Sequence, residues 1–175
     1  MARLTYPSEE SASAEFQETY RRVRERGGRV LNLFKIMSYS PEVGTKFLNL
    51  GNALLLKGVV PKTLRELAIL RVGNLYSAEY EWTQHVTIAL RVGVRQSQID
   101  ALPRWQNSPE FNDQEKAVLR YTDEVTLQIR ATDEAFAGVR SFLNEEAIVE
   151  LTTAIGYYGM VCRILETLQV ELEQE

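Results

Sequence analysis

The chain has 175 residues, a length typical of about one globular domain. Apolar residues make up 45% of it and charged residues 25%, which is ordinary globular composition and excludes a disordered or low-complexity protein. The formal net charge of −4, from 20 basic and 24 acidic residues, provides no cationic field and argues against non-specific binding to nucleic acid or membranes. A single cysteine excludes an internal disulfide and a two-cysteine redox pair within one chain.

Neither a secretory leader nor a membrane span is expected. The N-terminal sequence lacks the apolar segment of a secretory signal. The longest charge-free stretch, Leu151–Cys162, has 12 residues, whereas a helix that spans a bilayer needs roughly 20 apolar residues. We therefore expect a soluble cytoplasmic protein.

The hydrophobic pattern is helical along the whole chain. All five prolines fall between apolar-periodic segments, and no sustained period-two alternation or hairpin signal is present. The sequence therefore predicts an all-α, single-domain bundle of seven or eight helices over residues 1–175. In chain order, the predicted helices are Ser11–Arg26, Val30–Met37, Pro41–Gly58, one with Pro61 in its first turn that ends at Gly73-Asn74, one capped by Ser77 that ends at Arg91 or Val92 before Gly93, one opened by a capping box at Asn112–Glu115, and a last one opened by Asn144 that runs from Ala147 to about Leu172.

One region, residues 65–85, combines ionisable and aromatic side chains. It contains the only histidine, His85, and Glu81 lies four residues earlier on the same helix face. If the chain turns near residues 75–76, Glu66 and His85 each lie about nine residues, or roughly 13–15 Å, from the turn and should face each other across a helical hairpin. A carboxylate beside an imidazole fixes its tautomer and raises its pKa, so the three groups are suited to moving a proton near neutral pH.

Other interpretations of these residues stay open. His85 can be a packed structural residue, and Glu81–His85 an ordinary surface pair that contributes a few tenths of a kcal/mol. A metal could bind the three side chains, but no second imidazole is available, so neither a metal nor another cofactor is predicted. Glutamates interleave with the basic run that begins at Arg21, which favours a solvated helix face over a nucleic-acid site.

Glu66, the segment Glu79-Tyr80-Glu81-Trp82 and His85 resemble the carboxymuconolactone decarboxylase family, part of the alkyl hydroperoxidase D-like superfamily. The resemblance is clearest over residues 59–130, is weaker through the C-terminal helix, and leaves residues 1–40 as an N-terminal helical extension. It implies an alkyl hydroperoxidase D-like fold and a trimeric or hexameric homo-oligomer. Independently, the apolar run at Leu54-Leu55-Leu56 and the long apolar last helix indicate surface that is hidden in an oligomer.

The chain departs from the related hydroperoxidases at two positions. Alkyl hydroperoxidase D-type proteins have a Glu-x11-Cys-x2-Cys-x3-His pattern, and its ends match Glu66 and His85, but its cysteines fall on Ala78 and Glu81. Because a thiolate is the reactive species in peroxide reduction, this departure disfavours a dithiol peroxidase. We expect the remaining Cys162 to pack as a small apolar residue.

The resemblance implies removal of CO2 from a small carboxylated lactone or related ring compound in aromatic catabolism, without a cofactor. The ring and its carbonyl can take up the electrons that CO2 leaves, so the protein must supply a proton and stabilise an oxyanion. On this interpretation His85 donates the proton, and Glu81 or Glu66 orients it. The candidate substrate contacts are Tyr80, Trp82 and Arg71, with Arg65 and Arg163 as alternative partners of the substrate carboxylate. The alternatives are an antioxidant protein related to alkyl hydroperoxidase and a non-catalytic oligomeric binding module.

Overall fold

In the computed structural model, which describes residues 1–25 and 27–173, all regular structure is helical. These residues contain nine α-helices, two short 3-10 helices and no β-strand, so the all-α prediction is confirmed and the number of helices exceeds the seven or eight expected. The elements in chain order are η1 (Glu9–Ser11), α1 (Ala14–Glu25), α2 (Asn32–Met37), α3 (Pro41–Leu56), α4 (Lys62–Leu75), α5 (Glu79–Val92), α6 (Gln96–Ala101), η2 (Leu102–Asn107), α7 (Asp113–Gln128), α8 (Asp133–Arg140) and α9 (Glu145–Leu168).

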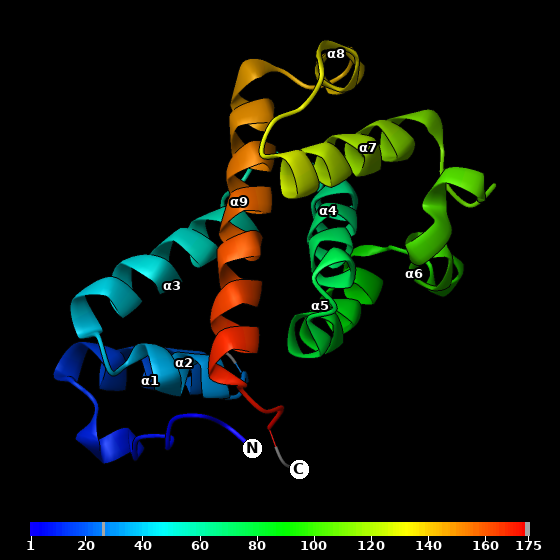
Figure 1. Cartoon of the computed structure of the whole chain (residues 1–175). Coiled ribbons are helices and arrows are strands. Elements are labelled where there is room, and N and C mark those ends of the chain that lie inside the picture. Colours follow the sequence, from blue (N-terminus) through cyan, green and yellow to red (C-terminus); the bar gives the residue numbers. More distant parts are fainter. Residues whose placement is uncertain (26, 174–175) are drawn as a thin grey trace. The chain divides into compact units, whose positions relative to one another are not determined.

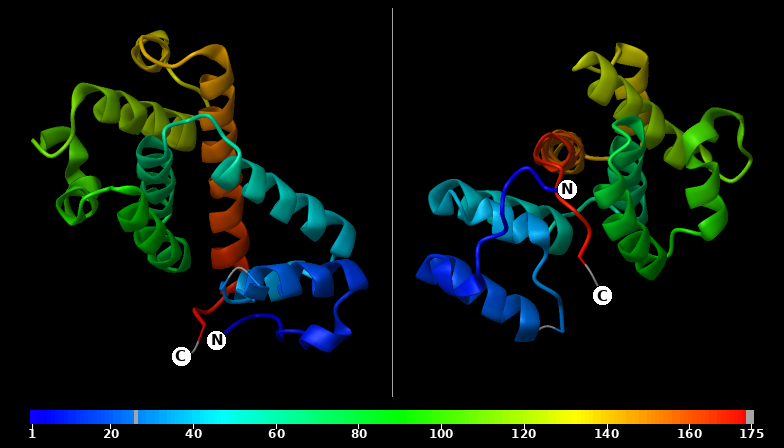
Figure 2. Two further views of the ribbon diagram at one scale, coloured as in Figure 1. Left: turned by 180° about the vertical axis from the view of Figure 1, so that it is seen from behind. Right: turned by 60° about the horizontal axis from the view of Figure 1, so that its bottom comes forward.

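The chain divides into two compact units. Met1–Lys57 and Ile164–Glu175 form the first unit, and Gly58–Arg163 form the second. Figure 1 and Figure 2 follow the elements of each unit from different directions. The residues predicted to carry the chemistry all lie in the second unit.

The first unit is built around aromatic side chains of α1. Phe16 and Tyr20 are buried, and their rings meet edge to face with centroids 5.9 Å apart. α3 packs against α1 and α2 through Gly44. A Cβ atom at this glycine would lie 2.4 Å from the carbonyl oxygen of Met37, closer than any real contact, so only glycine allows this approach.

α4 is the central helix of the second unit. Ten consecutive residues, from Leu64 to Gly73, are buried, and the helix packs against α5 and α7 (Figure 1). A helix buried on all sides is normally apolar all round, yet this one carries Arg65, Glu66 and Arg71. Because buried charges are tolerated only when they are paired, each of these side chains must have a charged or polar partner close by.

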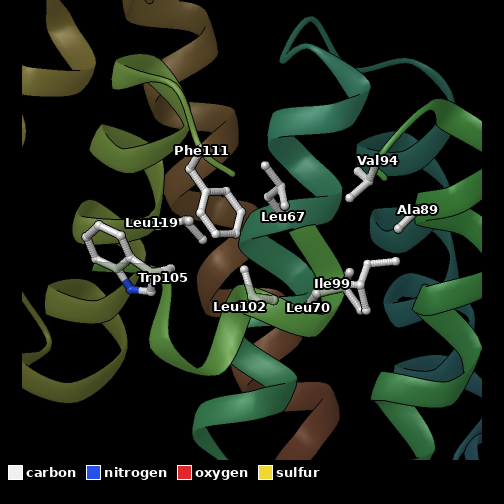
Figure 3. Packing of buried hydrophobic residues seen from close by; sticks show 9 residues of the cluster. All are labelled: Leu67, Leu70, Ala89, Val94, Ile99, Leu102, Trp105, Phe111 and Leu119. Atoms are coloured by element: carbon white, nitrogen blue, oxygen red, sulfur yellow. The ribbon is translucent and has the colours of Figure 1, made fainter. Parts of the chain in front are cut away.

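The apolar core of the second unit lies on one side of α4. Figure 3 shows Leu67 and Leu70 of this helix directed towards residues of α5, η2 and α7 and of the segments between them. The partly buried Trp82 and Val86 of α5 pack against the same cluster. Its members are Leu67, Leu70, Ala89, Val94, Ile99, Leu102, Trp105, Phe111 and Leu119.

A tight turn joins α4 to α5, and Ser77 does not cap α5 as the sequence suggested. Ser77 has a φ of +54°, and Ala78 is the N-cap residue of α5, without a side-chain capping bond. The N–H of Ala78 donates to the carbonyl of Gly73 at 2.9 Å, and the N–H of Ser77 to that of Asn74 at 3.2 Å. This is the pattern that ends a helix with a left-handed residue, so Ser77 terminates α4 rather than starting α5.

Other helix ends follow the sequence prediction more closely. The capping box of α7 is present, because Asn112 Oδ1 accepts from the N–H of Glu115 at 2.9 Å and the Glu115 carboxylate accepts from the N–H of Asn112 at 2.9 Å. Gly93 follows α5 with a φ of +105°, as expected of a helix-ending glycine. Pro61 is the N-cap of α4 and not part of its first turn, and α4 continues past Gly73 to Leu75.

The remaining differences concern short helices and helix termini. α1 begins at Ala14 rather than Ser11, since Glu9–Ser11 form a separate 3-10 turn; its predicted end at Arg26 lies outside the described residues. α9 ends at Leu168, before the predicted Leu172. α6 and α8 were not predicted, because six and eight residues are too few for a clear hydrophobic period.

Among the described residues, α9 is the one helix long and apolar enough to cross a membrane by length and composition alone. More than half of its apolar window, 56%, is buried inside the protein. Burial of this extent is the property of a core helix, and the helix contributes buried side chains such as Leu151, Ala154 and Tyr158.

Candidate active site

The hairpin of α4 and α5 brings Glu66 and His85 together, as their distances from the turn predict. His85 Nδ1 lies 2.8 Å from Oε2 of Glu66. On the other side of the ring, His85 Nε2 lies 3.1 Å from Oε1 of Glu81, one helical turn earlier on α5. The imidazole is therefore held between two carboxylates, one at each ring nitrogen.

The cluster is closed to solvent within the chain. Glu66 is 0% exposed, Glu81 4% and His85 6%, so the surface-pair interpretation of Glu81 and His85 is wrong. Arg65, also buried, directs Nε and Nη2 to Glu66 Oε1 at 3.3 and 3.2 Å. Glu66 therefore accepts from a guanidinium through one oxygen and faces the imidazole with the other.

The charges of this cluster balance. Burial of His85 opposes its charged form, but Glu81 and Glu66 outweigh that effect, and the pKa of the imidazole is raised. Burial raises the pKa of Glu81, opposed by His85 and reinforced by Glu66. The positive charge of Arg65 balances the negative charge of the Glu66 carboxylate. The remaining pair, His85 and Glu81, has no net charge when one extra proton is bound, either by the imidazole or by the carboxylate. Nδ1 of the imidazole faces Glu66, and Nε2 faces Glu81.

One oxygen of the cluster has no hydrogen bond. Glu81 Oε1 is buried and lacks a partner among the described residues, because its approach to His85 Nε2 at 3.1 Å does not have hydrogen-bond geometry. Buried polar atoms without partners are rare, and they concentrate at sites that act on a ligand or move a proton. The oxygen marks the point of the cluster where a reacting molecule would find a free polar atom.

A surface hollow lies close to Glu81. It has a volume of about 210 Å³ and is lined by Gly73, Asn74, Ser77, Ala78, Glu79 and Trp82. Gly73 also faces the Glu81 side chain, since a Cβ at this glycine would lie 3.7 Å from Glu81 Cγ. Gly73 therefore borders both the hollow and the Glu81 side chain.

The two carboxylates cannot converge on one ion. Each faces a different nitrogen of the imidazole, so the ring stands between them. In agreement, the described residues contain no group of three His, Cys, Asp or Glu side chains arranged to hold a metal.

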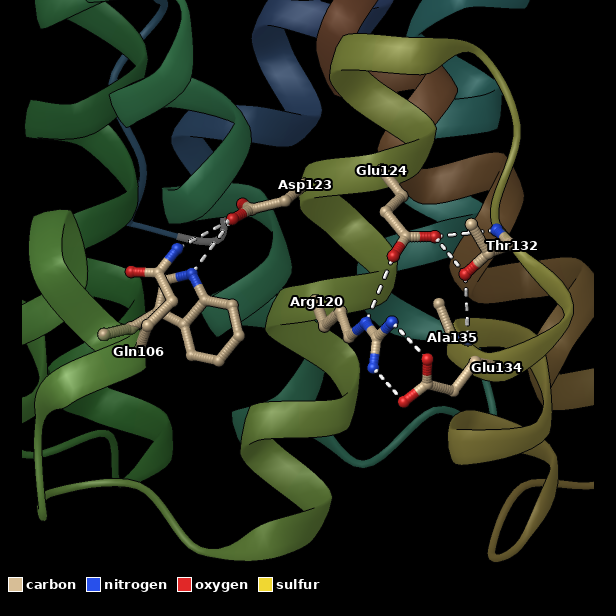
Figure 4. A network of polar contacts seen from close by, with 8 residues as sticks. Gln106, Arg120, Asp123, Glu124, Thr132, Glu134 and Ala135 are labelled. Carbon is tan, nitrogen blue, oxygen red and sulfur yellow. Dashed lines mark hydrogen bonds and ion pairs between the residues drawn. The ribbon is translucent and has the colours of Figure 1, made fainter.

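The three predicted substrate contacts have different surroundings. Tyr80 is buried, and Trp82 packs against the apolar core while its other side lines the hollow. The guanidinium of Arg71 bonds Asp123 at 2.5 and 3.1 Å and Asn74 at 2.8 Å. Figure 4 shows that Asp123 also accepts a hydrogen bond from the side chain of Gln106. The same view shows a separate polar network around Arg120. Arg71 is a structural ion-pair residue here, and a substrate carboxylate would have to displace Asp123 to reach it.

The other candidates also have defined positions. Arg163 donates to the hydroxyl group of Tyr76 at 2.8 Å, and its guanidinium lies over the ring of Tyr76 at 4.8 Å from the centroid. Cys162 is buried, as expected of a small apolar residue.

Sequence reasoning missed the aromatic side of the cluster. The ring of Tyr158, from α9, meets the ring of His85 edge to face, with centroids 4.8 Å apart and planes at 81°. Tyr157 meets Tyr158 in the same manner at 5.1 Å. Their spacing from His85 along the chain exceeds 70 residues, so no local pattern could join them; the adjacent pair of tyrosines within an apolar helix was the one available signal.

Solved structures define the class of fold. A protein of unknown function from Agrobacterium tumefaciens, provisionally assigned as the antioxidant defence protein AhpD, is 27% identical with a TM-score of 0.72, over 78% of this chain and 94% of that one. An uncharacterised peroxidase-related protein with an AhpD core from Ralstonia eutropha has a TM-score of 0.87 at 17% identity, over 99% and 93% of the chains. The debrominase Bmp8, solved with 2,3,4-tribromopyrrole, has a TM-score of 0.78 at 20% identity, over 92% and 87%. The fold is therefore that of the alkyl hydroperoxidase D-like proteins.

The sequence comparison identifies a similar family. Residues 41–124 match the carboxymuconolactone decarboxylase family. The protein YdfG of Bacillus subtilis is 29% identical over 107 residues, which cover 60% of this chain and 73% of YdfG. The chain is thus similar to the carboxymuconolactone decarboxylase family over residues 41–124, and its fold is alkyl hydroperoxidase D-like. The match includes Glu66, Glu81 and His85, so the buried cluster lies inside the family region.

Proposed function

We propose that this protein is a cofactor-free, cytoplasmic carboxy-lyase that removes CO2 from a small carboxylated lactone or related ring compound in aromatic catabolism. The observation that supports it most directly is His85, buried between two carboxylates, with one proton to share and one unpartnered carboxylate oxygen beside it. The carboxylates of Glu81 and Glu66 raise the pKa of this buried imidazole and so favour its protonated form, which suits a general acid.

In the proposed reaction, the bond between the ring and its carboxylate breaks, and its electron pair moves through the ring into the lactone carbonyl. CO2 leaves, and a dienolate remains. His85 Nε2–H then delivers its proton to the carbon at the far end of the dienolate, and the neutral imidazole regains a proton from water by way of Glu81. Glu66 keeps Nδ1 protonated throughout, which fixes the tautomer that presents Nε2 to the substrate.

We propose that the substrate approaches from the hollow beside Gly73. Small residues there bring the ligand close to Glu81, and Trp82 offers an apolar face to a planar ring. Tyr80 is buried, so it would contribute by shaping the wall of the proposed substrate site. Because Asp123 already occupies Arg71, this arginine is a weaker candidate for the substrate carboxylate than its residue type suggests.

The second candidate function is an antioxidant activity related to alkyl hydroperoxidase. The names of two structural relatives favour it, as one is assigned provisionally as AhpD and the other as peroxidase-related. Against it stand Ala78 and Glu81, at the positions where the resemblance places cysteines, and the burial of Cys162. Peroxide consumption with a thiol reductant, compared between the wild type and Cys162→Ser, separates this function from decarboxylation.

Turnover of a carboxymuconolactone tests the primary proposal. His85→Ala and Glu81→Gln are expected to lower kcat by about 10²- to 10⁴-fold, the usual contribution of a positioned general acid. Glu146→Gln is the matched control, because Glu146 is an exposed carboxylate on the first turn of α9 and is not among the residues that line the hollow. If His85→Ala retains turnover within a factor of three of the wild type, the assignment of His85 is wrong. No turnover by the wild type, together with tight binding of the ring compound, would favour the non-catalytic binding module.

We also propose that the chain forms a homo-oligomer, a trimer or hexamer. Large apolar side chains are exposed on α3 and α9, among them Leu56 at 65% and Val149 at 67%. Exposed apolar surface of this kind is commonly covered by another subunit. Light scattering coupled to size-exclusion chromatography measures the mass in solution, and a monomer at micromolar concentration would contradict this proposal.

A further inference from the structure

We propose that Tyr158 is a positioning residue, whose ring holds the imidazole of His85 in the plane that directs Nε2 at Glu81. This inference rests on the proposed function, since it assigns a role to Tyr158 in the same proton transfer. It concerns a residue of α9, outside the helical hairpin that supplies His85, Glu66 and Glu81.

The contacts of His85 leave one motion unrestrained without Tyr158. The groups that face the imidazole are Glu66 and, behind it, Arg65 from α4, Glu81 from α5, and Tyr158 from α9. The hydrogen bond to Glu66 fixes one edge of the ring, but Glu81 makes no well-directed hydrogen bond. A ring held at one nitrogen can still tilt about that bond. The edge-to-face contact with Tyr158, at 81° and 4.8 Å, is the packing that opposes this tilt.

Tyr158 is itself firmly placed. It is 3% exposed, and Tyr157 packs against its ring at 84°. Two turns earlier on α9, the carboxylate of Glu150 accepts from the N–H groups of Val59 and Val60, at 2.6 and 3.1 Å, just before α4 begins. These bonds fix this part of α9 against the start of the helix that carries Glu66. The ring of Tyr158 and the carboxylate of Glu66, which both contact His85, therefore lie on helices that are connected by these hydrogen bonds.

The ring of Tyr158, and not its hydroxyl group, performs this function. Burial raises the pKa of Tyr158 well above its ordinary value, with the nearby carboxylates adding to the effect, so the phenol stays neutral and does not titrate with His85. The ring also occupies volume that water would otherwise fill, which keeps the attraction between His85 and its carboxylates strong. Loss of the ring should loosen the imidazole and admit water, whereas loss of the hydroxyl group alone should not.

Solvent exchange of the ring N–H protons of His85 tests the proposal by NMR, in full-length protein without a histidine tag. Because the chain contains one histidine, every imidazole N–H signal belongs to His85. Tyr158→Leu is expected to accelerate this exchange by about 2- to 12-fold, the factor that corresponds to one aromatic edge-to-face pair. Tyr158→Phe is expected to exchange like the wild type. If Tyr158→Leu does not fold, Tyr158→Met replaces it, since methionine fills irregular space in a core.

Tyr20→Leu is the matched control. Tyr20 is also buried and also meets a neighbouring ring edge to face, but its partner is Phe16, in the first unit. Equal acceleration in Tyr20→Leu and Tyr158→Leu would mean that general loosening is being measured, and it would overturn the proposal. Unchanged exchange in Tyr158→Leu, or equal acceleration in Tyr158→Phe, would overturn it as well. The measurement uses no substrate, so a protein that shows the expected exchange but no turnover refutes the carboxy-lyase and leaves the role of Tyr158 in holding His85 intact.

Discussion

Replacing Glu66 by glutamine tests the energetics of the buried cluster. The substitution keeps the size and shape of the side chain and removes its charge. Arg65, which is 3% exposed, then loses the carboxylate that accepts from its Nε and Nη2. Breaking a buried ion pair in this way costs about 3–5 kcal/mol, because a buried charge is left without compensation. For a chain of this size, each kcal/mol lowers Tm by about 2–4 °C, so Glu66→Gln should lower Tm by about 6–20 °C.

The stability lost in Glu66→Gln should be recovered when the positive charge of Arg65 is removed as well. In the double variant Arg65→Met/Glu66→Gln, no charge remains at this pair, and the amide oxygen of the glutamine can still accept from His85 Nδ1–H. Because replacing a buried ion pair by uncharged residues of similar volume is often neutral, the double variant should be more stable than Glu66→Gln alone. Urea unfolding of the wild type, both single variants and the double variant gives the coupling energy directly.

Glu42→Gln is the control for this experiment. Glu42 pairs with Lys46 on α3 at 2.9 Å, but both side chains are largely exposed, so its removal should leave the urea midpoint unchanged. If Glu66→Gln is as stable as Glu42→Gln, or if the double variant is no better than Glu66→Gln, then the charge balance derived for the cluster is incorrect.

Three further predictions concern pH, the second buried ion pair and the hollow. The pKa of His85 is raised on folding, so its contribution to stability is fully present below about pH 6.5 and is lost as pH rises through the folded pKa. The pKa of Glu81 is also raised, so its contribution to stability likewise decreases with rising pH, from about pH 4.5 upwards. Urea midpoints between pH 5.5 and 9 should therefore fall more steeply for the wild type than for His85→Gln, and parallel curves would contradict this sign. Asp123→Ala should destabilise the protein by about 2–4 kcal/mol, because it strands the buried Arg71, while the NMR titration of His85 stays unchanged; a shifted titration would place Arg71 in the cluster after all. Gly73→Ala should raise stability by about 0.5–1 kcal/mol in urea unfolding, since glycine is unfavourable inside a helix and the new Cβ finds its neighbours at 3.6–3.8 Å, an ordinary contact; a loss of stability would mean that the wall beside Glu81 has no room for a methyl group.

The sequence was most informative where the signal is local or follows from helix geometry. The Asn112–Glu115 capping box and Gly93 specify helix ends by their own chemistry, and both are present. The approach of Glu66 and His85 follows from equal distances to a turn, which needs only the rise of an α-helix. These features do not depend on the rest of the chain.

Features that depend on distant contacts could not be predicted. Arg71 has the residue type of a carboxylate-binding side chain, but Asp123, 52 residues later, determines where its guanidinium points. Tyr158 reaches His85 from another helix, and the adjacent pair of tyrosines in that helix does not indicate which residue they contact. Ser77 was misassigned for a different reason, because a serine between two helices can serve the end of the first or the start of the second, and only the backbone torsion distinguishes them.

The place of Glu81 opposite the imidazole has a consequence for how this fold could change its chemistry over evolutionary time. A carboxyl group and a thiol are both acids that can give one proton to a neighbouring histidine, and either resulting anion would be matched by the imidazolium. An exchange of glutamate for cysteine at position 81 would thus convert a proton-handling centre into a nucleophilic one without leaving an orphan charge in the protein interior. The two-cysteine pattern of the related hydroperoxidases would require a cysteine in place of Ala78 as well, whereas Arg65, Glu66 and His85 could remain.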